Sequence, residues 1–305
     1  ELRSKHVSNV KYLINLYLDR ISNQYKGKTK ISFHFKKSGI EELIVDFINY
    51  KVHCLKINGT GTADYRKDEF WLYINSNNLS EGENTIEIEY TSNYDNTGSG
   101  FHRFIDPEDN EVYIHTDFEP YDAHRLFPCF DQPDLKATYQ LDITGPTDWE
   151  FIHNSDPRSI VKHNDLKQVI FKETAVFSTY IFALVVGPHK KWVDIYNNIP
   201  LRLYCRKSLA NHLDPENLFD ITKESFKFLE TYFNIPYPYE KYDQIFVPEF
   251  NFGAMENKGL NIFNSRLVLA SPETATDRDY NLVQGGIAHE YFHNWSGNRV
   301  TCRDW

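Results

Sequence analysis

Two histidines four residues apart, with a glutamate between them, are the residues of this sequence best suited to chemistry. They occur in the segment His289-Glu290-Tyr291-Phe292-His293, which reads H-E-x-x-H in a stretch of helical character. Residues four apart on a helix lie on the same face, so both imidazoles can bind one metal ion. Glu290 would then lie beside the metal as a general base for water, as in zinc hydrolases. The motif alone leaves open a second interpretation, two histidines on an ordinary helix without a metal.

The bulk composition is that of a soluble globular protein with room for two domains. The chain has 305 residues, of which 41% are hydrophobic and 25% charged. The net charge is −10 and no basic stripe occurs, which argues against nucleic-acid binding. The sequence contains no apolar run of about 18 residues, so it predicts no membrane span. The four cysteines form no C-x-x-C pair, so we expect a reducing compartment and a cytoplasmic protein.

The first part of the chain has the alternating pattern of β-strands, separated by short turn-rich segments. Apolar and polar residues alternate, or apolar residues run together, in Val10–Leu18, Lys28–Phe35, Phe70–Ile74, Thr85–Tyr90, Ala137–Thr144, Gln168–Lys172 and Thr179–Val186. The pattern predicts an antiparallel all-β domain over residues 1–188.

Residues 189–305 have a different texture and form a second predicted domain. Asp214-Pro215 is a helix start, and the residues that follow at helical spacing are Leu218, Ile221, Ser225, Phe228, Leu229 and Tyr232. Tyr242–Val247 is a short predicted strand. A second helix is expected from Thr276 to Gly297, with both histidines on it. Its two internal glycines, Gly285 and Gly286, are expected at places of close backbone packing.

A second motif precedes the predicted helix that carries His289 and His293, and the two motifs together are more specific than either alone. Its residues are Gly253, Ala254, Met255, Glu256 and Asn257. With GAMEN followed by H-E-x-x-H, the sequence resembles the aminopeptidase N family of zinc metallopeptidases, which are gluzincins, and its bacterial branch in particular. The resemblance covers about Gly98 to Trp305. It implies a multi-domain α+β fold: an N-terminal antiparallel β saddle domain followed by the first part of a thermolysin-like α/β catalytic domain.

The resemblance implies one Zn²⁺ per complete chain, with His289 and His293 as metal ligands and Glu290 as the catalytic base. The third ligand would be a glutamate on the following helix, beyond Trp305, and the family's transition-state tyrosine would lie further downstream. We therefore expect these 305 residues to be a piece of a longer protein that lacks its C-terminal part. We expect partial or no zinc occupancy in this piece, and we expect it to be inactive alone.

The resemblance also implies how a peptide with a free N-terminus would be held. Glu256 would bind the N-terminal ammonium by a charge-assisted hydrogen bond. Glu119, which precedes Pro120 in the segment HTDFEP, would be a second amine anchor. Asp117 occupies a place where relatives often carry Gln, so its role is open.

The other substrate-binding candidates lie in and next to the GAMEN motif. The backbone of Gly253 and Ala254 would lie along the substrate like an added strand, with Met255 and Asn257 in the same motif. Phe252 either lines the pocket for the first side chain or is a buried strand aromatic.

The predicted function is the zinc-dependent release of N-terminal amino acids from peptides, by attack of an activated water. Three alternatives stay open. A zinc endopeptidase would share the helix motif without the amine anchor. An epoxide hydrolase of the same fold is disfavoured by Glu119 in place of Gln. A non-catalytic scaffold or binding piece would use neither motif for chemistry.

Overall fold

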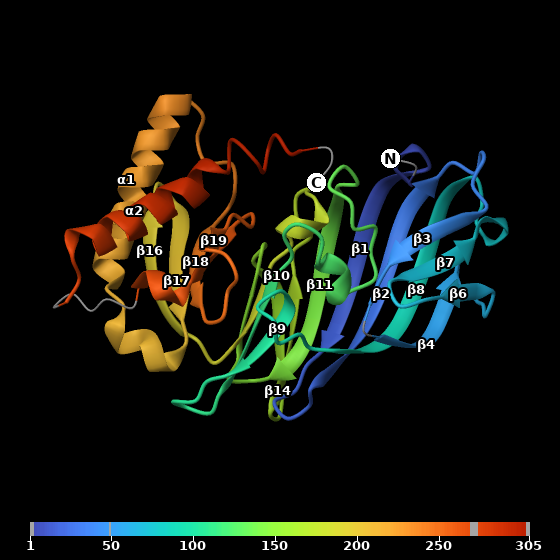
Figure 1. Cartoon of the computed structure of the whole chain (residues 1–305), viewed down its shortest axis with the longest axis horizontal. Helices are drawn as coiled ribbons and strands as arrows, with labels where there is room; N and C mark the ends of the chain where they lie inside the picture. Colours follow the sequence, from blue (N-terminus) through green and yellow to red (C-terminus); the bar gives the residue numbers. More distant parts are fainter. Residues whose placement is uncertain (1–2, 49, 269–273, 303–305) are drawn as a thin grey trace.

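The computed structural model describes residues 3–48, 50–268 and 274–302, and in this part of the chain strands dominate. They form sheets of eight, four, five and three strands, with two α-helices, α1 (Pro215–Phe233) and α2 (Asp277–Phe292). Figure 1 shows the first half of the chain as a broad twisted β structure and the two helices on a smaller sheet beside it. No described helix has the length and apolar character needed to cross a membrane.

The N-terminal part contains three sheets. In spatial order, the eight-stranded sheet consists of β13 (Pro157–His163), β14 (Leu166–Phe171), β11 (Ala137–Pro146), β1 (Val7–Tyr17), β2 (Gln24–Phe35), β8 (Gly82–Asn93), β4 (Tyr50–Ile57) and β5 (Thr60–Gly61). The others are β3 (Glu42–Asp46), β7 (Trp71–Asn75) and β6 (Tyr65–Lys67), and then β12 (Glu150–His153), β15 (Leu184–Gly187), β10 (Val112–Asp117) and β9 (Gly100–Ile105). Short 3₁₀ turns lie at Arg3–Lys5, Ser76–Asn78, Ala123–Arg125, Thr179–Ile181, Lys207–His212 and Ser265–Val268.

Alternating side chains produce these sheets. In β1 the even-numbered residues from Val10 to Leu16 are buried and their neighbours face outward, because successive strand residues point to opposite faces. Most pairs are antiparallel, as predicted, but β1 and β11 are parallel, with Val10 opposite Ala137. The long chain between these two strands supplies the crossover that a parallel pair requires.

The predicted strand Thr179–Val186 was wrong at its start. Thr179–Ile181 forms a 3₁₀ turn, and the strand begins only at Leu184. Every residue from Phe177 to Val186 is buried. Because apolar and polar residues do not alternate in such a segment, its sequence does not show where the turn ends and the strand begins.

The second part is built on a five-stranded sheet with the order β16 (Lys190–Tyr196), β17 (Ile199–Cys205), β18 (Tyr242–Val247), β20 (Leu260–Asn264) and β19 (Ala254–Met255). β18 is buried along its whole length, as expected for a parallel strand covered on both faces. On one face, Ile245 and Ile262 join the core of the β domain. On the other, Tyr242 packs with α1 and α2. The domain boundary at residue 188 stays a prediction.

Helix α1 begins as its sequence predicts and buries a different aromatic residue. Asp214 caps it by accepting a hydrogen bond from the Asn217 N–H at 3.2 Å. Phe226 is buried and stacks on Tyr291 of α2, with ring centroids 3.9 Å apart. Phe228 and Tyr232, which share the predicted apolar spacing, are exposed, because the face toward the sheet is centred on Phe226.

Helix α2 starts with a capping box, in which the side chains of Thr276 and Asp279 bond to each other's backbone N–H groups. It ends at Phe292 rather than at the predicted Gly297. Beyond Phe292 the backbone tightens, since the Asn294 N–H bonds to the Tyr291 carbonyl at 3.2 Å, and Gly297 reverses the chain at φ +121°.

The expected close packing at the two helix glycines was wrong. A Cβ at Gly285 would meet no atom within 4 Å, and one at Gly286 would meet only Leu267, at 3.9 Å. Gly285 is exposed, and a Cβ at Gly286 would make only an ordinary van der Waals contact with the 3₁₀ turn Ser265–Val268.

Candidate active site

The last turn of α2 brings the H-E-x-x-H residues together. The Nε2 atoms of His289 and His293 lie 3.0 Å apart. His293 stands at the C-terminal cap of the helix. Its Nδ1 lies 2.9 Å from the Ser296 carbonyl oxygen, which accepts the Nδ1–H hydrogen bond. That bond leaves the Nε2 lone pair of His293 free to bind a metal.

The residues present fit a metal ion. Two nitrogens at zinc-like bond lengths of about 2.0–2.1 Å and a tetrahedral angle lie roughly 3.3 Å apart, close to the histidine spacing seen here. Ligand atoms of Glu256, Glu290 and His293 also lie within 4.8 Å of one another. Glu290 Oε2 is buried and has no hydrogen-bond partner in the described part of the chain. An unpaired buried acceptor beside two imidazoles suits a site completed by a cation and its bound water.

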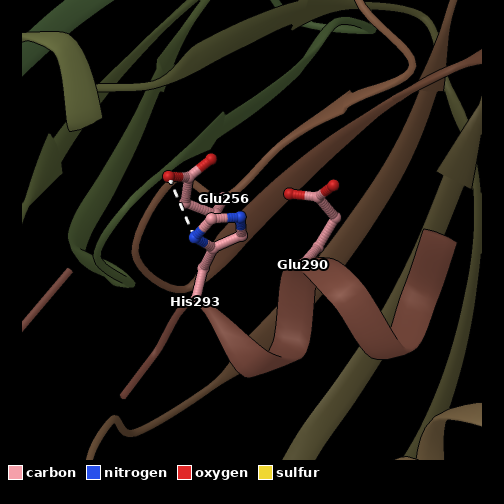
Figure 2. A group of neighbouring side chains, drawn as sticks. All are labelled: Glu256, Glu290 and His293. Atoms are coloured by element: carbon pink, nitrogen blue, oxygen red, sulfur yellow. Dashed lines mark ion pairs between the residues drawn. The ribbon is translucent and has the colours of Figure 1, made fainter. Parts of the chain in front are cut away.

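Glu256 enters the site from the GAMEN segment, on the other side of the histidines. Its Oε1 lies 3.4 Å from His293 Nδ1 (Figure 2). Its backbone carbonyl accepts a hydrogen bond from the Asn298 side chain at 2.7 Å. The next residue, Asn257, donates to the Ile181 carbonyl at 3.1 Å. The loop is therefore fixed to both the turn after α2 and the β domain.

Two residues of the GAMEN segment, Ala254 and Met255, form β19, which lies at the edge of the five-stranded sheet. Ala254 pairs with Phe263 and Met255 with Ile262, and β19 has no partner strand on its outer side among the described residues. Gly253 is exposed, and a Cβ there would meet nothing within 4 Å. The unpaired edge and the open space at Gly253 leave room for an extended peptide to pair with β19.

Glu119 comes from the β domain, two residues after the end of β10, and is half-buried. Burial raises the pKa of its carboxyl, the Glu256 carboxylate raises it further, and the His293 imidazole lowers it. For Glu290, burial and then repulsion from Glu256 and Glu119 raise the pKa to about 8. Three carboxylates that repel one another in a desolvated space form a site that favours a cation such as an ammonium group.

Phe252 and Asp117 differ from the simplest expectations. Phe252 is 45% exposed, so the interpretation as a buried strand aromatic was wrong. Asp117 is buried, and neither carboxylate oxygen has a hydrogen-bond partner among the described residues. Burial, and then Asp122 and Glu119, raise the pKa of Asp117 to about 7.

Two residues of this neighbourhood were not found from the sequence. Tyr180 is buried, and Glu256 and Glu119 both add to the rise in its phenol pKa. Asn298 is buried and holds the Glu256 backbone. Tyr180 gives no signal in the sequence, because only the fold brings the 3₁₀ turn at Thr179–Ile181 near the GAMEN loop. A polar residue just after Gly297 was the single available hint for Asn298.

Comparison with known proteins shows the family to which the chain belongs. The family model described as Peptidase M1 N-terminal domain matches residues 8–181, and the one described as Peptidase family M1 domain matches residues 218–305. The chain is 39% identical over 287 residues to an aminopeptidase N of Streptomyces lividans, covering 92% of this chain and 32% of the relative.

Two further relatives show the same coverage. An aminopeptidase N of Haemophilus influenzae is 33% identical over 312 residues, and the match covers 95% of this chain and 34% of that relative. An aminopeptidase A of Gloydius brevicauda is 30% identical over 313 residues, covering 98% and 32%. The chain thus spans about a third of the length of the curated relatives it matches. With both family models matched in order along most of its length, the chain belongs to peptidase family M1, a family of metallopeptidases.

Proposed function

We propose that the natural protein containing this chain is a zinc-dependent aminopeptidase that releases N-terminal amino acids from peptides. The observation that carries the proposal is the meeting of two kinds of group in one space. Glu256, which approaches His293 to 3.4 Å, and Glu119 suit a free ammonium. The paired imidazoles of His289 and His293 suit a metal, with Glu290 beside them.

Each residue has a separate task in the proposed reaction. His289 and His293 would hold zinc, which when bound polarises the scissile carbonyl and makes water more acidic. Glu290 takes a proton from the attacking water as its oxygen adds to the carbonyl carbon, and gives that proton to the leaving nitrogen as the C–N bond breaks. Glu256 and Glu119 bind the substrate ammonium and so place the first peptide bond, and no later one, at the reacting centre.

The backbone of β19 supports the same orientation. Gly253 and Ala254 would pair with the extended substrate, and Phe252, whose ring is exposed, would contact the first side chain. A blocked N-terminus removes the ammonium and leaves buried carboxylates without a partner. Such a site rejects the analogue strongly.

We further propose that the third zinc ligand lies outside these 305 residues, so this chain alone holds zinc weakly and is inactive. Dialysis followed by metal analysis tests this directly. Stoichiometric zinc in the 305-residue chain would contradict it. The cytoplasm remains our proposed location, supported by four free cysteines, and cell fractionation tests it.

A matched substrate pair tests the function. The natural protein at its full length is incubated with a dipeptide amide that has a free N-terminus and with its N-acetyl form. We expect cleavage of the free form alone. Cleavage of both forms would indicate an endopeptidase, and cleavage of neither by the zinc-loaded protein would support a non-catalytic scaffold.

A further inference from the structure

A cavity of about 270 Å³ lies at the seam between the β domain and the five-stranded sheet, and we call it the seam cavity. It is lined by residues 154–156, 172–175 and 177 of the β domain, and by residues 238–241 and 258–259 of the second part of the chain. The two sides are held closely together. A Cβ at Gly259 would lie 2.7 Å from the Asn154 carbonyl oxygen, and the Asn154 side chain donates to the Lys258 carbonyl at 3.0 Å. The cavity is therefore preformed.

Most charged side chains of the seam cavity are already neutralised by ion pairs. Six of its lining residues carry charge, and four of them form ion pairs of 2.7 Å or shorter. The pairs are Lys172 with Glu240 at 2.7 Å, Lys241 with Asp243 at 2.5 Å, and Asp156 with Arg202 at 2.7 Å. The two remaining charges, Lys258 and Glu173, have opposite signs.

Lys258 has no carboxylate partner within 4.0 Å in the described ranges, and its surroundings are electropositive. Its ammonium donates to the Val176 carbonyl at 3.3 Å and lies over the rings of Phe177 and Tyr239. Burial, and then the nearby charges of Lys136 and Arg299, lower the pKa of Lys258 to about 8. An anion bound at this ammonium would offset both the burial of the charge and the repulsion from Lys136 and Arg299.

Glu173 offers the complementary charge. Its carboxylate reaches one cation, Lys11, at 4.0 Å, and both side chains are at least half exposed. Such an exposed ion pair contributes little to stability, so Glu173 can pair with a ligand instead. Ala175, Pro238 and Tyr239 supply an apolar wall in the same cavity. The seam cavity thus presents one cation, one anion and an apolar surface within a small space.

We propose that the seam cavity binds a free α-amino acid with an apolar side chain. The ligand carboxylate would bind Lys258, its ammonium Glu173, and its side chain the apolar wall. The volume is just below the roughly 300 Å³ at which sites for drug-sized ligands begin, which suits a single amino acid. Because Lys258 follows the GAMEN segment directly, an occupant would contact the chain that carries Glu256. A role in sensing the released product rests on the proposed function, whereas binding itself does not.

Calorimetric titration of L-leucine into the natural protein at full length tests the proposal. Lys258→Met and Glu173→Gln should each weaken binding at the seam cavity about tenfold or more, the value of one lost charge-assisted hydrogen bond. Lys258→Arg keeps the charge and should retain binding within about threefold. Glu256→Gln is the matched control, because it should alter leucine binding at the active site and leave the seam cavity unchanged.

Two ligand controls need no variant. L-leucinamide keeps the ammonium but lacks the carboxylate, so it should not displace leucine from the seam cavity. N-acetyl-L-leucine lacks the ammonium and should also fail. Unchanged leucine binding in Lys258→Met, or displacement by leucinamide, would overturn the proposal. Failure of the unaltered protein to hydrolyse dipeptide amides with a free N-terminus would overturn the proposed function instead. The calorimetric evidence for leucine binding at the seam cavity would still stand.

Discussion

Asp117 should destabilise the fold at neutral and alkaline pH, and Asp117→Asn should remove that cost. The side chain is buried, and its two oxygens lack hydrogen-bond partners in the described structure. Its pKa is about 7 in the fold, against an ordinary value of 3.8. Each tenfold change in proton affinity is worth about 1.4 kcal/mol. Burying Asp117 therefore costs about 4 kcal/mol at pH 8, where it is ionised in the fold, and about 2 kcal/mol at pH 5, where it takes up a proton on folding.

The sign of the pH dependence follows because Asp117 binds its proton more tightly in the folded state than in the unfolded state. The stability of the unaltered chain should be constant below the unfolded pKa, fall as pH rises from about 4 to about 7, and then level off. In Asp117→Asn this fall should be absent. Urea unfolding of both proteins at pH 5 and pH 8 measures it, and the gain from the substitution should be about 2 kcal/mol larger at pH 8. An equal gain at both pH values would refute the assignment of a raised pKa to Asp117.

Four further substitutions test the site. Glu290→Gln in the full-length protein should keep zinc bound and reduce kcat by about 10²–10⁴-fold, and activity above a few percent would exclude a general base there. Glu256→Gln should raise KM for free-amine peptides about tenfold, and an equal effect on N-blocked peptides would contradict the anchor role. Gly297→Ala places a Cβ 2.8 Å from His293 Nδ1 at φ +121°, so zinc titration should show affinity weakened about tenfold or more. Gly285→Ala, whose Cβ meets nothing, should instead stabilise the chain by up to about 1 kcal/mol in urea unfolding.

The sequence predicted the parts of this molecule that depend on neighbouring residues. The start of α2 at Thr276 follows from local capping, and the closeness of His289 and His293 follows from helix geometry. The helix end did not follow, because hydrogen bonds in the turn after Phe292 decide it. Parallel pairing of β1 with β11 and the approach of Tyr180 to Glu256 join segments far apart in the chain, and no local pattern encodes such contacts.

The position of His293 at the cap of α2 has a consequence for the motion of this region. Helix termini are where helices fray, and of the two candidate ligands His289 lies within α2 whereas His293 lies at its C-terminal cap. An ion bound to both would tie the fraying end to the turn before it. Metal occupancy would then be readable as slower amide hydrogen exchange in residues 293–298, the turn whose Asn298 side chain holds the Glu256 backbone.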